Sequence, residues 1–149
     1  MLKPIAVGTL VAGTLDILFA MILTSIFGRE IPNMLRYVAS GPFPAAMEMG
    51  TNGAILGLLV HFTLMGIMAA AFVIATRRIP ALVEKPILWG ALYGLATYVV
   101  LNWIVVPLRF GTPLPPKPLS IATQLFAHIV LVGIPFALIA VRYLRPARS

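Results

Sequence analysis

Five strongly polar side chains lie inside otherwise apolar stretches of this 149-residue chain. Asp16, His61 and His128 are the members that titrate, and Asn102 and Gln124 accompany them. An aspartate with histidines permits acid–base chemistry or a proton relay. Two histidines can also ligate a haem iron, or join an aspartate at another metal. Which chemistry applies depends on the elements that position these side chains.

The apolar stretches identify those elements as transmembrane helices. The chain is 60% hydrophobic and 10% charged, with a mean hydropathy of +1.02, whereas a soluble domain carries roughly 25% charged residues. Four stretches are long enough to span a bilayer: residues 5–27, 54–75, 87–106 and 121–141. Lipid offers no hydrogen bonds to the backbone, so each must be helical. We therefore expect one all-α membrane domain over residues 1–149, with four transmembrane helices in an antiparallel bundle.

Basic residues at the ends of the apolar stretches predict the orientation. With the N-terminus inside, the cytoplasmic side carries seven of them: Lys3, Arg77, Arg78, Lys85, Arg142, Arg145 and Arg148. The opposite side carries four: Arg29, Arg36, Arg109 and Lys117. This bias places both termini in the cytoplasm. It also accounts for the net charge of +7 without a nucleic-acid partner, which we do not expect.

The connections differ in length and composition. Within the longest, residues 28–53, the segment 32–40 predicts a short interfacial helix. We expect its apolar side chains, Met34, Leu35 and Val38, to face the membrane. The short connection 77–86 predicts that the second and third helices pack as antiparallel neighbours. The third connection contains four prolines and predicts a stiff, extended external strap.

Small residues form stripes along the four helices, and two stripes contain a GxxxG pattern. The glycines expected at helix contacts are Gly53, Gly57, Gly90 and Gly94, because membrane helices associate through small residues. The strongly polar side chains continue along the same faces. At 1.5 Å per residue, His61 and His128 lie roughly 10 Å below the outer boundary. Asn102 reaches the same level, Gln124 lies one turn above His128, and Asp16 lies deeper, so a polar cluster is expected.

The role of that cluster is open on the sequence alone. An uncompensated carboxylate at the bilayer centre costs at least ~2.5–3.5 kcal/mol, so Asp16 should face the bundle. It is either a proton-relay or cation site, or a protonated group that hydrogen-bonds a neighbouring helix. The histidines are likewise either structural hydrogen-bonding residues or members of a relay. The seven methionines are expected to fill gaps in helix packing.

Residues 61–145 resemble the YagU-like family of bacterial inner-membrane proteins. The similarity begins at HFTLMGIMAAAFVIATRRIP and passes through LWGALYGLATYVVLNWIVVPL and GTPLPP to QLFAHIVLVGIPFALIAVRYLR. The resemblance implies a bacterial inner-membrane location and intramembrane histidines at His61 and His128. It implies no reaction.

Several functions are compatible with this pattern. The chain lacks GxSxG, HExxH, P-loop and dinucleotide motifs, so we expect a non-enzymatic membrane protein. It would be a small homo-oligomer or an accessory subunit of a larger assembly, in contact with lipid and other membrane chains. The first alternative is a proton- or cation-handling channel or transporter. A b-type haem or metal held by His61 and His128 ranks lower, because glycine stripes bring helices too close for a porphyrin; no cofactor or metal is expected. An enzyme acting on a lipid or quinone remains a further alternative.

Overall fold

Helices account for the regular structure of the chain, and four of them are long and apolar enough to cross a membrane. The computed structural model describes residues 1–144, and no strand occurs among them. The first two spans are α1 (Leu2–Ile26) and α3 (Gly50–Thr76). The third is the continuous run of α5 (Pro86–Tyr98), η2 (Val99–Val105) and α6 (Val106–Phe110). The fourth is the run of α7 (Pro118–Phe126), η3 (Ala127–Gly133) and α8 (Ile134–Leu144). The prediction of four apolar helices is confirmed.

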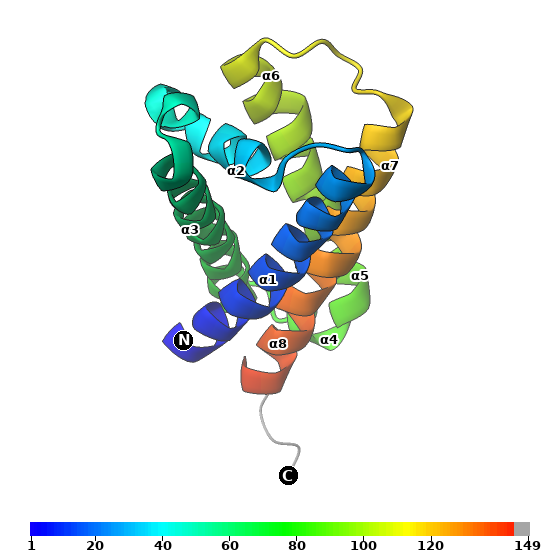
Figure 1. The fold of residues 1–149 in the computed structure, drawn as a ribbon. Coiled ribbons are helices and arrows are strands. Elements are labelled where there is room, and N and C mark those ends of the chain that lie inside the picture. Colours follow the sequence, from blue (N-terminus) through cyan, green and yellow to red (C-terminus); the bar gives the residue numbers. More distant parts are fainter. Residues whose placement is uncertain (145–149) are drawn as a thin grey trace.

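Short elements connect the spans at the two ends of the molecule. Helix α2 (Ile31–Ser40) and the 3₁₀ turn η1 (Pro44–Glu48) lie between α1 and α3, and α4 (Ala81–Glu84) lies between α3 and α5. The start of α1 and the last turn of α8 lie at the same end of the molecule as α4, and α2 and the segment 111–117 lie at the opposite end (Figure 1). We call these the α4 end and the α2 end. At the first residue of α3, Gly50 has a φ of 55°, which a glycine adopts without strain.

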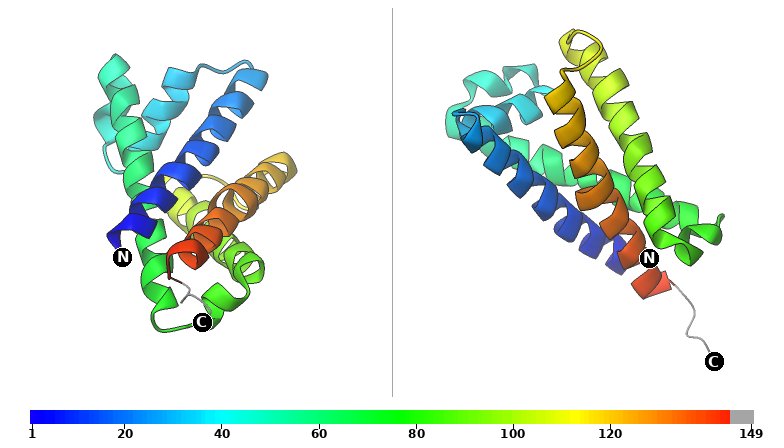
Figure 2. Two further views of the ribbon diagram at one scale, coloured as in Figure 1. Left: turned by 90° about the horizontal axis from the view of Figure 1, so that it is seen from below. Right: turned by 90° about the vertical axis from the view of Figure 1, so that its right-hand side faces the viewer.

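The spans do not pack in the order of the sequence. Helix α3 packs on α1, α1 packs on η3 and α8, and these pack on α5, in an arrangement that Figure 2 shows from two further sides. The second and third spans therefore stand at the two sides of this series. Near the α4 end they touch, because the Tyr93 hydroxyl donates to the Met68 carbonyl oxygen at 2.8 Å. Toward the α2 end a cavity separates them, so the expectation that these two spans pack as antiparallel neighbours is wrong there.

Glycines explain this order. The two glycines of α5 and the two of α3 each bring a different segment into backbone contact. A Cβ on Gly94 would lie 2.7 Å from the Cα of Ile129, and one on Gly90 would lie 2.8 Å from the Gly133 carbonyl oxygen. Gly90 and Gly94 thus hold the third span directly against the fourth. A Cβ on Gly57 would instead lie 2.6 Å from the carbonyl carbon of Leu35 in α2.

The glycine face of α3 is consequently occupied by the connection that precedes it. A Cβ on Gly53 would lie 3.2 Å from the carbonyl carbon of Ala46 in η1. Leu35 of α2 is buried in a small cluster with Ile17 of α1 and Ala54 of α3. The expectation that Leu35 faces the membrane is therefore wrong, because this apolar side chain packs against α1 and α3.

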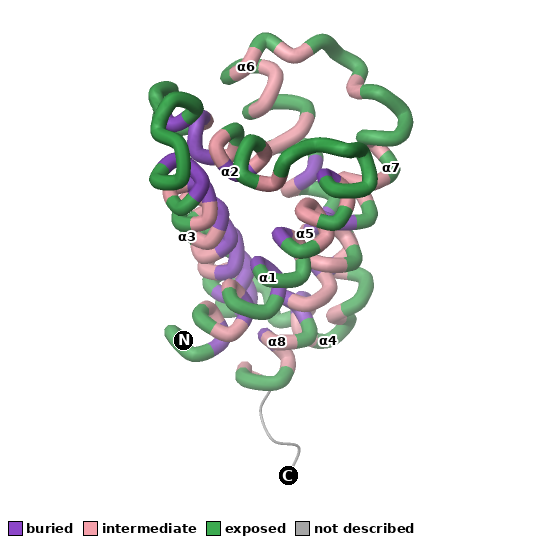
Figure 3. The backbone as a smooth tube through the Cα atoms, viewed as in Figure 1, coloured by how far each residue is buried: buried purple, intermediate pink, exposed green. Residues whose placement is uncertain are grey.

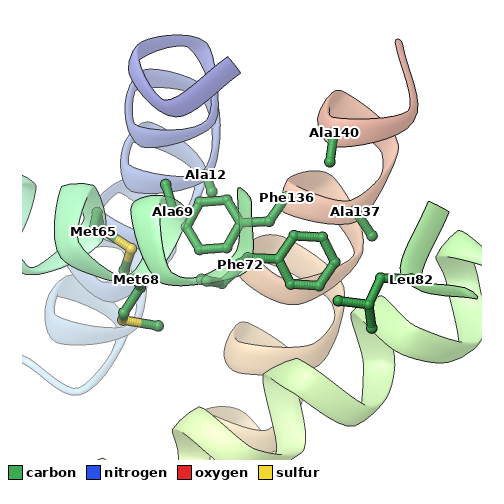
Figure 4. Packing of buried hydrophobic residues seen from close by; sticks show 10 residues of the cluster. Ala12, Met65, Met68, Ala69, Phe72, Leu82, Phe136, Ala137 and Ala140 are labelled. Atoms are coloured by element: carbon green, nitrogen blue, oxygen red, sulfur yellow. The ribbon is translucent and has the colours of Figure 1, made fainter. Parts of the chain in front are cut away.

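The larger apolar core lies toward the α4 end. There Phe72 of α3 and Phe136 of α8 pack with Met65, Ala12 and Leu82, as Figure 4 shows. Buried residues follow the inward side of α3 and the fourth span, while outward-facing positions are exposed along every span (Figure 3). These exposed side chains are aliphatic for the most part, as a lipid-facing surface requires.

Two spans contain π-helical segments, and each segment ends two residues before a proline. Segment η2 ends at Val105, before Pro107, and η3 ends at Gly133, before Pro135. A proline supplies no N–H to the preceding turn, and its ring crowds the carbonyl four residues earlier. Widening the helix by one residue per turn accommodates that ring. Asn102 and His128 lie within these two segments.

Candidate functional site

Asp16 and His61 form the first polar contact inside the spans. The Nδ1 atom of His61 lies 3.9 Å from Oδ2 of Asp16. The other ring nitrogen, Nε2, lies 2.9 Å from the Gly13 carbonyl oxygen and must donate a hydrogen to it, because a carbonyl only accepts. Neutral His61 therefore presents the lone pair of Nδ1 to Asp16. A single proton, on the carboxyl or on Nδ1, would make this contact favourable.

Close packing of α1 on α3 fixes that arrangement. A Cβ on Gly13 would lie 2.8 Å from Cε1 of Phe62, so a larger residue there would displace the Phe62 ring, which packs edge-on against the His61 ring. The His61 side chain is buried, whereas the Asp16 side chain keeps 21% of its surface exposed. Among residues 1–144 the Asp16 carboxyl forms no side-chain hydrogen bond.

His128 belongs to a second polar set, between the third and fourth spans. Its Nδ1 lies 3.1 Å from the Thr97 hydroxyl, and its Nε2 lies 3.4 Å from the side-chain nitrogen of Asn102. The Thr97 hydroxyl donates its hydrogen to the Gly94 carbonyl oxygen at 2.9 Å. It can therefore only accept from His128, which places the imidazole hydrogen on Nδ1.

The remaining hydrogen bonds of this second set are consistent with that assignment. Nε2 of His128 then carries a lone pair and accepts from the Asn102 amide, which also donates to the Tyr98 carbonyl oxygen at 3.4 Å. Both ring nitrogens of this buried histidine are thus satisfied while it is neutral. Protonation would place two donors face to face, at Asn102 and Nε2, so the set favours a structural role.

The predicted cluster is divided by the structure into these two sets. Asp16 is placed with His61, and Asn102 with His128; no side-chain hydrogen bond joins the sets within residues 1–144. Gln124 lines the cavity between the second and third spans and forms no side-chain hydrogen bond within that range. Thr97 was not singled out from the sequence, because five residues before Asn102 it lies on a different side of a regular α-helix. Both side chains nevertheless contact His128.

The cavity has a volume of about 850 Å³ and lies toward the α2 end. Aliphatic side chains of α3 form one wall and those of η2 and α6 form the other, for example Val60 and Val105. His128, Asn102 and Gln124 line its deeper part, and the end of α2 and the segment after it line its outer end. This cavity has no signal in the sequence, because it arises where two spans diverge.

Two contacts tie α2 to α6 at the outer end of the cavity. The Tyr37 and Phe110 rings are stacked with centroids 4.5 Å apart. Arg109 donates through Nε to the Gly41 carbonyl oxygen at 2.6 Å and through Nη2 to that of Ser40 at 2.8 Å. Burial raises the pKa of the Tyr37 hydroxyl, and the Arg109 guanidinium opposes that rise. Tyr37 is therefore a neutral donor near a cation.

No group of three or more His, Asp or Glu side chains is arranged to hold a metal ion among residues 1–144. For a haem, the two histidines contact different neighbours: His61 faces α1, and His128 faces the third span. An iron at His128 would have to displace Thr97 or Asn102 from a ring nitrogen. The arrangement therefore favours hydrogen bonding by both histidines over ligation of a shared group.

Comparison with known protein-family models, curated proteins and solved structures finds no match for this chain.

Proposed function

We propose that this chain is a non-enzymatic, multi-pass protein of the bacterial cytoplasmic membrane. It forms an antiparallel four-helix bundle and acts as a small homo-oligomer or as an accessory subunit of a larger membrane assembly. The bacterial location rests on the resemblance of residues 61–145 to the YagU-like family. The lipid bilayer and other membrane-protein chains are its partners.

The main support for this proposal is that much of the third span is left uncovered by the rest of the chain. Fewer residues are buried in this span than in any of the other three. It packs on the fourth span along its glycine face, while Leu92, Val99 and Ile104 are exposed. Ala96 is exposed on the same helix, and small residues allow a second helix to approach closely. Another chain packed here would bury this surface.

The polar residues support a structural rather than a catalytic role. His128 is hydrogen-bonded at both ring nitrogens, and the sequence contains none of the common motifs of hydrolases or nucleotide-binding enzymes. Buried polar groups in a bundle stabilise it when they find partners. We therefore assign the His128 set to holding the third span against the fourth.

The proposed orientation has the α4 end in the cytoplasm and α2 on the outer surface. Lys3, Arg77, Arg78, Lys85 and Arg142 lie at or near the α4 end. Arg145 and Arg148, which complete the predicted seven, lie outside the described residues. The four basic residues at the opposite end are Arg29, Arg36, Arg109 and Lys117. The excess on the α4 side supports cytoplasmic termini, with α2 as an interfacial helix.

Single cysteines, introduced into this cysteine-free chain, test orientation and association together. We expect Glu84→Cys to react with an impermeant maleimide only in inverted membrane vesicles, and Pro113→Cys to react in intact cells. Leu92→Cys or Val99→Cys should form an intermolecular disulfide under mild oxidation, or crosslink to another membrane protein. The reason is that these two side chains face outward from the least covered span.

Leu10→Cys is the matched control for association, because Leu10 is equally apolar and is exposed on α1. It should give no adduct under the same oxidation. Chains that stay monomeric and unlinked at Leu92, Val99 and Leu10 alike would contradict an oligomer or accessory subunit. Reaction of Glu84→Cys in intact cells would reverse the proposed orientation.

A proton-handling function is the second candidate, and the Asp16–His61 contact favours it. The carboxyl lies 3.9 Å from the imidazole, has no side-chain hydrogen bond among residues 1–144, and is partly exposed. A group of this kind within a span is a functional candidate by default. Against it, no side-chain hydrogen bond continues from this pair to the His128 set.

Proton flux into liposomes separates the two candidates. We expect liposomes that contain the wild type, Asp16→Asn or His61→Gln to acidify at one common rate under a potassium diffusion potential, as measured with a pH-sensitive dye inside. The amides keep hydrogen-bonding groups but cannot titrate near neutral pH. Wild-type flux above that of protein-free liposomes, lost in both variants and kept in His128→Gln, would establish the second candidate instead.

A further inference from the structure

The cavity between α3 and the third span has the size and composition of a ligand site. Its volume of about 850 Å³ falls within the range of roughly 300–1,000 Å³ that small-molecule and cofactor sites occupy. Its walls are aliphatic, as Leu59, Val60, Ile67 and Val105 illustrate. A mostly apolar cavity with a few polar groups suits a ligand that is mostly hydrocarbon.

The charge at its outer end specifies the polar part of that ligand. Arg109 lines the cavity and forms no ion pair with a carboxylate among residues 1–144. Two of its N–H groups bind the carbonyl oxygens of Ser40 and Gly41, which leaves both N–H groups of Nη1 without a protein partner in that range. A guanidinium with free donors recognises phosphate or carboxylate oxygens.

Two further polar groups point to the same kind of ligand. Tyr37 lines the cavity near Arg109, and its hydroxyl forms no hydrogen bond among the described residues. The Gln124 amide lines the deeper part of the cavity and is likewise without a side-chain hydrogen bond there. A molecule with an anion at one end, a polar linkage below it and a hydrocarbon tail would meet all three groups in turn.

We propose that this cavity binds one anionic phospholipid of the surrounding bilayer, with its phosphate at Arg109 and Tyr37 and one acyl chain between α3 and the third span. The ester linkage then accepts a hydrogen from Gln124. A quinone fits the apolar walls equally well, but it offers no negative charge to Arg109. The anionic lipid is therefore the occupant that the charge distribution favours.

Native mass spectrometry of the purified protein, titrated with phosphatidylglycerol or phosphatidylethanolamine of identical acyl chains, tests this proposal. Phosphatidylglycerol should bind one molecule per chain more tightly than the zwitterionic lipid. Arg109→Gln should weaken phosphatidylglycerol binding by about tenfold, the effect of losing one charge-assisted hydrogen-bonded contact. Val60→Trp should weaken binding of both lipids, because an indole would fill the acyl-chain path.

Matched controls separate this site from general effects. Arg29→Gln removes a cation at the same end of the molecule that does not line the cavity, and Leu18→Trp enlarges an exposed side chain of α1. Both should bind phosphatidylglycerol within about twofold of the wild type, well under the factor of ten set by one charge-assisted contact. Equal losses in Arg109→Gln and Arg29→Gln, or in Val60→Trp and Leu18→Trp, would overturn the proposal.

Displacement of phosphatidylglycerol by decylubiquinone would also overturn the proposal, since a neutral ligand would then occupy the cavity in preference to the anionic lipid. A melting curve of each variant in detergent confirms that it is folded. Because binding is counted per chain, the result does not depend on whether the chain self-associates.

Discussion

Replacing Gly94 with alanine should destabilise the folded protein by about 3 kcal/mol, the upper part of the range for overpacking a core. The added Cβ would lie 2.7 Å from the Cα of Ile129, and it would also overlap the His128 carbonyl group. Both neighbours are backbone, so neither can rotate away as a side chain would. The third and fourth spans must separate, which also stretches the hydrogen bonds among Thr97, His128 and Asn102. Reversible unfolding in mixed detergent micelles would measure the loss.

Gly66→Ala is the matched control, because it makes the same chemical change in a helix of the same bundle. A Cβ on Gly66 meets Thr9 at 3.6 Å, an ordinary van der Waals distance. Alanine favours the helix by up to about 1 kcal/mol over glycine, so this variant should be as stable as the wild type or more stable. If Gly94→Ala is also at least as stable as the wild type, the two spans are not in backbone contact.

Gly57→Leu should detach α2 from α3 while leaving the spans in place. A Cβ at this position would lie 2.6 Å from the carbonyl carbon of Leu35 and 3.1 Å from its Cα, and the rest of a leucine would push α2 further away. Hydrogen–deuterium exchange of residues 31–40 should then speed up by about tenfold or more, as expected when a segment loses about 1.4 kcal/mol of local stability. Exchange within the fourth span should not change.

Gly66→Leu again provides the comparison, since it adds the same side chain to α3 about two and a half turns further along. Residues 31–40 should exchange at the wild-type rate in that variant. Equal acceleration in both variants would mean that leucine on α3 disturbs the whole bundle. Unchanged exchange in Gly57→Leu would mean that α2 does not depend on this glycine.

The spans were predictable from the sequence because the bilayer imposes a simple requirement. A stretch of about 20 apolar residues has few alternatives to a membrane helix. Helix α2 could also be located, since Pro32 stands near its start and Gly41 directly follows Ser40. The segment that packs on each glycine stripe could not be predicted. A GxxxG pattern indicates a surface that allows close approach, but it does not specify which segment packs there. Gly57 meets α2 and Gly94 meets the fourth span, yet their sequence surroundings look alike.

For the polar residues, the depth within each span could be predicted from the sequence, but the neighbouring spans could not. Helical rise placed Asn102 and His128 at one level, and the structure brings them within hydrogen-bonding distance. Whether His61 joins them depends on which spans are neighbours, a property of the whole bundle. The π-helical segments had a visible signal in Pro107 and Pro135, which crowd the turn before them. The cavity had no such signal in the sequence, because its size depends on how far α3 and the third span diverge.

The contacts of Arg109 also order events during synthesis. Its partners, the carbonyl groups of Gly41 and Ser40, lie 68 and 69 residues earlier in the chain. Because translation proceeds from the N-terminus, α1, α2 and α3 have all been synthesised before Arg109 exists. Over that interval α2 can pack on Gly57, but the carbonyl groups of Ser40 and Gly41 lack Arg109 and the Tyr37 ring lacks Phe110. The α2 end of the protein is therefore completed late, when the third span brings Arg109 and Phe110 to α2.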